Sequence, residues 1–241
     1  MSDTTSPHLF PVNGPSDRRL SPAAVQQAFD PTRLTQARNL AGLTKKKLSD
    51  LIGVSAAAVT QYELGTNRPR PDILPRLADV LAVPMSFFLV GRPHGRLEAS
   101  AAHFRSLRST RSYQRAKAVA YTEQVWELTH ALEKRVQLPW VDVPGFAGGE
   151  VDPVATDPVA AARLLRKAWG LGTGPISHLV RRMEAHGIVV STPERDPDLE
   201  SVDAYSTTRL PRPIVVLTPN RTACPAMSRR NERLMCSLRS S

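Results

Sequence analysis

The sequence predicts a mainly α-helical N-terminal domain of five helices, followed by a helical connector and a partial α+β domain. Three observations predict this fold class: short capped helices crowd between Asp30 and Leu89, an apolar stripe at helical spacing follows, and strand-like runs begin at Ile188. The expected organisation is a flexible leader over 1–29, the helical domain over 30–92, the connector over 93–138, the α+β domain over 139–219 and a disordered tail over 220–241.

The composition indicates a globular chain with a polyanionic partner. The chain has 241 residues, of which 41% are hydrophobic, and its formal net charge is +10. This charge favours nucleic acid as a partner first and an acidic membrane surface second. No stretch approaches the roughly 20 apolar residues of a membrane span, so we expect a soluble, cytoplasmic protein that does not enter a membrane. Two cysteines, Cys224 and Cys236, argue against a disulfide framework and are a weak signal for zinc.

Capping residues mark the starts of the first three helices. Asp30 and Pro31 begin the first, because an aspartate cap followed by proline suits a first helical turn. Thr44 caps the second helix and Ser55 caps the third. Gly53 closes the second helix, and we expect it in the left-handed conformation.

The fourth helix is expected over residues 71–81, and a short fifth element over 84–89. Apolar residues recur at helical spacing in all these segments, so the helices can enclose one small core. The residues expected to face inward are Leu34, Ala37, Leu40, Ala41, Leu48, Leu51, Ile52, Val59, Tyr62, Leu64, Ile73, Leu74, Leu77, Ala78 and Leu81.

The second and third helices form a pair that implies a function. The second is amphipathic, a Gly53–Val54 turn follows it, and the third is short with a small, polar outer face. Such a pair places its second member against a DNA groove. The segment 43–65 therefore predicts double-stranded DNA as the partner.

Residues 34–89 resemble the XRE-type, lambda-repressor-like helix-turn-helix family, most specifically over 43–65. The resemblance implies that residues 55–61 enter the major groove, where an amide can bond an adenine edge and small side chains can touch thymine methyls. It also implies an ion pair between Arg38 and Glu63 that fixes the first helix against the third. The implied base contacts are Ser55, Ala56, Ala57, Thr60 and Gln61, and the implied phosphate contacts are Lys45, Lys46, Arg68 and Arg70.

Residues 97–138 are expected to be helical, with an apolar stripe on one face. Arginines at Arg105, Arg108, Arg111 and Arg115 interrupt this stripe. Two interpretations stay open: the arginines are solvated on a connecting helix pair, or they form a second surface that contacts DNA.

After Pro139, predicted helices give way to predicted strands. Asp157 and Pro158 begin a helix that runs to Trp169, and a second helix is expected from Pro175 to His186. Apolar, β-branched runs then predict strands over 188–190 and 214–217, and residues 203–206 are a further strand candidate.

Residues 138–217 resemble the N-terminal part of the ImmA/IrrE-type metallopeptidase domain. The resemblance rests on the segments 138–139, 160–176, 183–190, 203–206 and 212–217. That family places a His-Glu-x-x-His helix shortly after the strand that corresponds to 214–217, where two histidines bind zinc and the glutamate acts on a bound water.

This chain has no His-Glu-x-x-His motif. We therefore expect no enzymatic activity, no catalytic residue, no metal site and no cofactor, and we expect His178 and His186 to be helix-surface or capping residues. The histidines of the chain are His8, His94, His103, His130, His178 and His186.

The tail suggests a hypothesis for the missing motif. With one allowed choice of codons and a shift of two bases, residues 231–240 encode a string that resembles what that family carries after its metal-binding helix. An insertion or deletion that cut a peptidase domain short would explain this. The nucleotide sequence tests it, because the alternative frame must continue the family pattern downstream.

Three functions remain as alternatives from the sequence. The first is a sequence-specific DNA-binding transcriptional regulator that acts as a homodimer. The second is a relative of the zinc endopeptidases, inactive here because the motif is lost. The third is a protein-interaction or antitoxin-like module.

Overall fold

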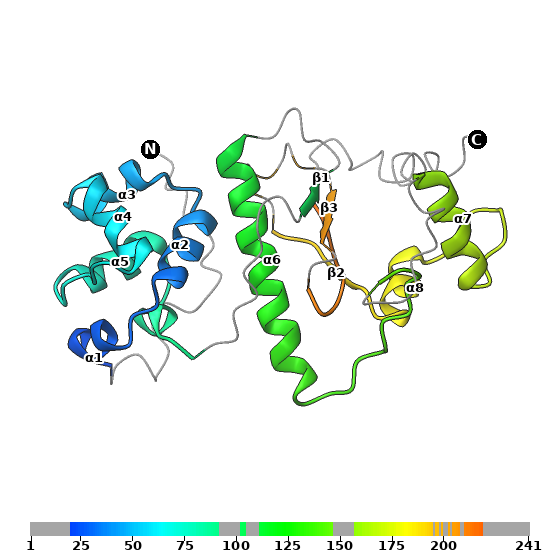
Figure 1. The fold of residues 1–241 in the computed structure, drawn as a ribbon, viewed down its shortest axis with the longest axis horizontal. Coiled ribbons are helices and arrows are strands. Elements are labelled where there is room, and N and C mark those ends of the chain that lie inside the picture. Colours follow the sequence, from blue (N-terminus) through cyan, green and yellow to red (C-terminus); the bar gives the residue numbers. More distant parts are fainter. Residues whose placement is uncertain are drawn as a thin grey trace, which may run out of the picture. The chain divides into compact units, whose positions relative to one another are not determined.

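The computed structural model describes residues 20–91, 102–104, 111–146, 157–194, 196–197, 199, 202, 204–207 and 210–218. Outside these residues lie the first 19 residues of the expected leader, Arg105, Arg108 and the expected tail over 220–241 with its two cysteines. The chain divides into two compact units, one of 1–94 with 111–121 and the other of 95–110 with 122–241 (Figure 1). Each unit has its own architecture.

Residues 20–91 of the first unit form short helices. They are α1 (Pro22–Gln27), α2 (Pro31–Leu40), α3 (Lys45–Ile52), α4 (Ala56–Leu64), α5 (Ile73–Leu81) and the 3-10 helix η2 (Met85–Phe88). The predicted caps are confirmed: Asp30 accepts from the Thr32 N–H at 2.9 Å, and Thr44 accepts from the Lys47 N–H at 3.1 Å. Each cap satisfies an amide that the first turn leaves without a partner.

Helix α1 corrects the prediction of a flexible leader up to residue 29. Ser21 caps this helix and Pro22 begins it, and Val25 and Phe29 are buried. Phe29 also pairs with Leu89 in an antiparallel bridge. Burial against the other helices fixes this short segment, whose own length is too small for independent helix formation. The remaining predicted domain boundaries stay predictions.

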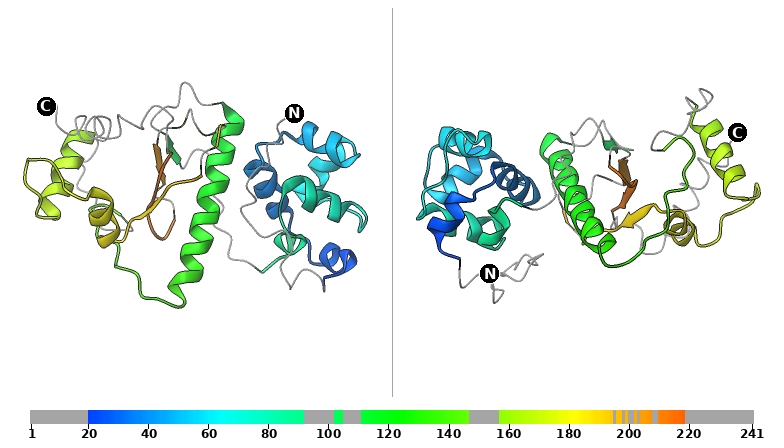
Figure 2. Two further views of the ribbon diagram at one scale, coloured as in Figure 1. Left: turned by 180° about the vertical axis from the view of Figure 1, so that it is seen from behind. Right: turned by 60° about the horizontal axis from the view of Figure 1, so that its bottom comes forward.

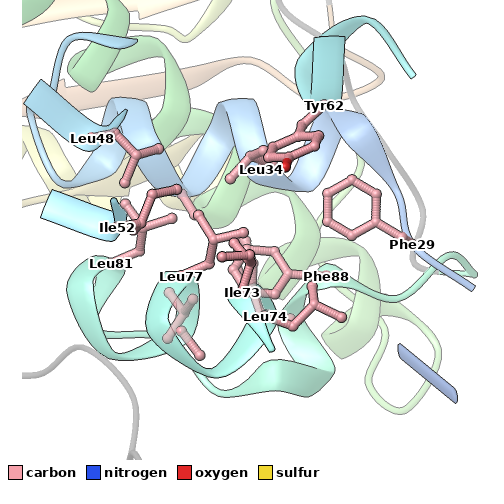
Figure 3. Packing of buried hydrophobic residues seen from close by; sticks show 14 of the residues in the cluster. Phe29, Leu34, Leu48, Ile52, Tyr62, Ile73, Leu74, Leu77, Leu81 and Phe88 are labelled. Carbon is pink, nitrogen blue, oxygen red and sulfur yellow. The ribbon is translucent and has the colours of Figure 1, made fainter. Parts of the chain in front are cut away.

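One apolar core joins the helices from α1 to η2. Figure 3 shows the labelled side chains converging from α2, α3, α4, α5 and η2. The buried apolar residues are Val25, Phe29, Leu34, Ala37, Leu48, Ile52, Val59, Tyr62, Ile73, Leu74, Leu77, Ala78, Leu81, Val83, Phe87 and Phe88.

Two leucines expected in this core point outward instead. Leu51 is 50% exposed and Leu64 is 70% exposed. Leu64 follows the buried Val59 by five residues, which turns it about 140° away at 3.6 residues per turn. Leu51 lies on the flank of α3, which packs inward through Leu48 and Ile52. Leu40 and Ala41 are only partly buried.

The second unit contains a four-stranded sheet in the order β1-β3-β4-β2. The strands are β1 (Ala102–Phe104), β2 (Val189–Ser191), β3 (Ala204–Thr207) and β4 (Ile214–Leu217). β3 pairs antiparallel with both β1 and β4, and β2 pairs parallel with β4. The prediction of β4 is confirmed at both ends, and β2 and β3 each lie one residue later than predicted.

Strand β1 corrects the prediction that residues 97–138 are helical throughout. Among the described residues of that segment, the helix is α6 (Ser112–Glu133), and the chain turns after it. β1 is three residues long and its pattern carries no strand signal; its pairing with the edge of β3 makes it a strand.

Helices α7 (Pro158–Ala168) and α8 (Leu179–Ala185) complete the second unit. Figure 2 shows α8 leading into β2. The predicted start of the second helix at Pro175 is wrong, because His178 has a φ of 52° and a right-handed helix cannot contain that conformation. The buried apolar residues around the sheet are Ile188, Leu199, Val202, Tyr205, Leu210, Ile214 and Val216.

Candidate nucleic-acid interface

Helix α4 has two distinct faces. Val59 and Tyr62 are buried in the core, whereas Ala56, Ala57 and Gln61 are exposed. α4 packs against α2 and α3, and Figure 1 shows α3 beside it (cyan). Ser55 caps the helix by accepting from the Ala58 N–H at 3.1 Å, and Gly65 ends it with a φ of 73°. The packing therefore presents one small, polar face outward.

The polar groups of this face differ in what they can still bond. Thr60 is half-buried and its hydroxyl donates to the Ala56 carbonyl at 3.0 Å, so the helix already uses that donor. Among the described residues, the Gln61 side-chain amide forms no hydrogen bond. An unbonded amide on an exposed helix face can donate to and accept from a base edge.

A cluster of charges ties α4 to two neighbouring helices. The Arg38 Nε lies 2.5 Å from the Glu63 Oε1, and the Lys45 Nζ lies 3.3 Å from the Glu63 Oε2. The structure therefore places Arg38 and Glu63 as the expected ion pair, and it adds Lys45 as a third member. Sequence reasoning missed this last contact, because it depends on how the start of α3 lies against the end of α4.

The expected phosphate contacts lie in different surroundings. Lys46 is exposed on α3. Arg70 is exposed and its Nη2 lies 3.2 Å from the Asp72 carboxylate. Arg68 is bound internally: its Nη1 donates to the Gln27 carbonyl at 2.7 Å. These positions bring Lys45 and Lys46 together at the start of α3 and leave Arg68 against α1.

Two glutamines of α1 contact the loop that follows α4, and the sequence did not reveal these contacts. The Gln26 amide donates to the Pro69 carbonyl at 3.1 Å, and the carbonyls of Gln26 and Gln27 accept from Arg68. Together these bonds hold the loop that follows α4. The signal that could have revealed α1 is Ser21 followed by Pro22, a cap and a first-turn proline.

The second unit holds the two histidines expected at helix surfaces. His178 precedes α8, and His186 follows it, half-buried and stacked on Trp169 at 4.2 Å between ring centroids. The His186 Nδ1 lies 2.9 Å from the Asp142 Oδ2. Within the described ranges, no group of three or more His, Cys, Asp or Glu side chains could hold a metal ion. None of the described helices is long and apolar enough to cross a membrane.

Comparisons with known proteins agree with the geometry of the first unit. Residues 34–88 match the helix-turn-helix family model HTH_3, so the chain contains a helix-turn-helix domain over those residues. An uncharacterized HTH-type transcriptional regulator of Sinorhizobium medicae (strain WSM419) and another of Rhizobium meliloti (strain 1021) are each 30% identical over 80 residues. That similarity covers 30% of this chain and 58% of each relative. No solved structure matches the chain.

Proposed function

We propose that this chain is a sequence-specific DNA-binding transcriptional regulator whose α4 reads the major groove. The observation that carries the proposal is the division of α4 into a buried face with Val59 and Tyr62 and an exposed face with Ala56, Ala57 and Gln61. A helix with small side chains and one open amide can approach base edges closely. The helix-turn-helix match and the similarity to HTH-type regulators support it.

The proposal includes binding as a homodimer. A single α4 with alanines at 56 and 57 offers few hydrogen-bond donors to base edges. One copy of the chain alone therefore has little sequence preference. Two copies of the chain, bound to half-sites one helical turn apart, multiply their modest affinities because they are linked in one dimer. The expected binding site is therefore an inverted repeat with half-site centres about 34–36 Å apart.

The proposal assigns no peptidase activity to the second unit. The resemblance of 138–217 to the ImmA/IrrE-type domain stays a hypothesis about ancestry. It is supported by sequence segments alone, and no His-Glu-x-x-His motif follows β4 in this sequence. Without two histidines one turn apart, the chemistry of a zinc-bound water has no such ligand pair.

Selection of bound duplexes from random DNA tests the proposal with the full chain. We expect an enriched inverted repeat and a linear fall of log affinity with log salt, because lysines and arginines displace counterions from phosphates. Gln61→Ala should lower the preference for one base pair in each half-site by about tenfold, since a bidentate base contact is worth about 1–3 kcal/mol.

Gln27→Ala is the matched control. Gln27 is an exposed glutamine on α1. Its main-chain carbonyl accepts from Arg68, and among the described residues its side chain forms no hydrogen bond. This variant should select the same sites as the parent chain. If no sequence is enriched, or if both variants behave alike, the proposed readout by α4 is wrong and a protein-interaction module becomes the better account.

A further inference from the structure

The Glu63 carboxylate is shared by two cations from different helices. Arg38 in the last turn of α2 approaches it with Nε at 2.5 Å and with Nη2 at 3.3 Å. Lys45, the first residue of α3, approaches Oε2, the same oxygen that the Arg38 Nη2 contacts, at 3.3 Å. Glu63 itself lies near the end of α4, so one carboxylate joins three helices.

Arg38 and Glu63 already satisfy one another. The Arg38 guanidinium contacts both oxygens of Glu63, and its Nη1 donates to the Leu43 carbonyl at 2.8 Å. The two side chains are 12% and 5% exposed, so this pair belongs to the interior. A bidentate pair with its remaining donors satisfied is the geometry in which a buried ion pair persists.

Lys45 is the surplus charge of this cluster. Two cations and one carboxylate leave a net charge of +1, and the Lys45 side chain, at 41% exposed, is far more open to solvent than those of Arg38 and Glu63. An ammonium group has three donors, and Glu63 is the acceptor that the structure gives it. The cluster therefore presents a positive charge outward that one further anion would balance.

Glu63 also limits where this ammonium can be. A lysine side chain has four flexible carbons, and holding it in one place costs rotamer entropy when a ligand binds. Contact with Glu63 restricts Lys45 before any ligand arrives. Because Glu63 belongs to α4, the restricted ammonium keeps a fixed position relative to the helix that carries Gln61.

We propose that Glu63 is a positioning residue for DNA binding, which holds the Lys45 ammonium so that it binds a backbone phosphate in register with α4. This inference rests on the proposed function, because it names how that same interface fixes its phosphate contact. The array then runs Arg38, Glu63, Lys45, phosphate, with charges that alternate in sign. The phosphate contact sets position and orientation, and the face of α4 supplies the sequence preference.

A double-mutant cycle on the full chain and its selected duplex tests the inference. Lys45→Met should weaken binding about tenfold and reduce the slope of log affinity against log salt by about one, as the loss of one phosphate contact requires. Lys47→Met is the matched control, because Lys47 is an exposed lysine on the same helix. Its effect should be smaller than that of Lys45→Met.

The decisive comparison repeats both lysine changes beside Glu63→Gln. If Glu63 positions Lys45, then in the Glu63→Gln background Lys45→Met should reduce DNA affinity no more than Lys47→Met does. A general structural effect of Glu63→Gln would change both lysine effects equally. Should that variant fail to fold, Glu63→Asp keeps the charge beside Arg38 and withdraws the carboxylate by one methylene, and it should give the same loss of coupling.

The outcomes separate this inference from the function on which it rests. If Lys45→Met lowers DNA affinity equally in the parent chain and in Glu63→Gln, the positioning role is wrong, while DNA binding as the function still stands. Equal effects of the two lysine changes in the parent chain overturn the positioning role also. If the parent chain binds no duplex at all, both the function and the inference are wrong.

Discussion

The short helices α1 to α5 with η2 and the helices α7 and α8 differ in how they are held. Each helix from α1 to α5, together with η2, contributes to one buried cluster, whereas none of the residues that the structure describes in α7 and α8 is buried. The core of the second unit lies instead around β3 and β4, through Tyr205, Ile214 and Val216.

Helices α7 and α8 are fastened by a few directed contacts. Trp169, just after α7, donates its Nε1–H to the Asp142 carbonyl at 2.8 Å and stacks on His186, just after α8. Apolar side chains on the helices themselves stay partly open, with Leu164 39% exposed. Few buried contacts imply local opening at low free energy, so the two units should respond differently to similar substitutions.

The largest difference is expected from a leucine truncated in each region. Leu74→Ala removes a fully buried side chain of α5 and should lower the free energy of unfolding of the first unit by about 3 kcal/mol. Leu164→Ala removes a partly exposed one from α7 and should cost under about 1 kcal/mol. Hydrogen exchange of peptides from 20–91 and 157–190 measures both, and equal costs would contradict the contrast.

A glycine substitution tests the directed contacts of the second unit. Gly187 has a φ of 80°, and a Cβ there would lie 2.7 Å from the carbonyl carbon of Trp140 and 2.8 Å from the Val141 Cα. Gly187→Ala should therefore destabilise this region by more than about 2 kcal/mol, from left-handed strain together with the clash.

Gly170→Ala is the control for that strain. Gly170 has a φ of 62° and open space around the position of a Cβ, so only the conformational cost of about 1 kcal/mol applies. Thermal unfolding followed by tryptophan fluorescence compares the two variants. If they are equally destabilised, the close approach of the 140–141 main chain to Gly187 does not matter.

Helix caps provide the smallest and most closely matched comparison. Ser55 caps α4, and Asp157 caps α7 by accepting from the N–H groups of Val159 and Ala160 at 3.2 and 3.1 Å. Replacement of either by alanine should cost about 1 kcal/mol. The loss of Ser55 should lower the cooperative stability of the first unit, whereas the loss of Asp157 should increase exchange within α7 alone. Exchange that spreads beyond α7 would show that α7 is cooperative with the sheet.

Elements that have local sequence signals, such as caps and apolar runs, could be predicted from the sequence. The caps at Asp30, Thr44 and Ser55 gave helix starts that the structure confirms, and the β-branched run of 214–217 gave β4 with its bounds. These signals are reliable because they act over only a few residues. A cap bonds backbone amides of the first helical turn, and an apolar run supplies the side chains that are buried. The exposed face of α4, with Ala57 and Gln61, could be predicted for the same reason.

Elements that depend on distant partners could not be predicted. β1 is a strand because β3 offers it an edge, and its short sequence does not require this. His178 has a left-handed conformation, which histidine as a residue type does not predict, and it prevents the helix from starting where the sequence predicted. Arg68 donates to a carbonyl of α1. The sequence predicted a flexible leader where α1 lies, so this contact could not be foreseen.

The amino-acid sequence by itself determined the helix-turn-helix unit: where its helices begin, where glycines end them and which side of α4 is small and polar. The tertiary structure alone decided which side chains share a partner, such as Lys45 and Arg38 on Glu63, and which leucines face solvent, such as Leu51 and Leu64. The physical reason is range. Caps and periodicity act within one or two turns, whereas ion pairs, strand edges and burial arise between segments that only the folded chain brings together.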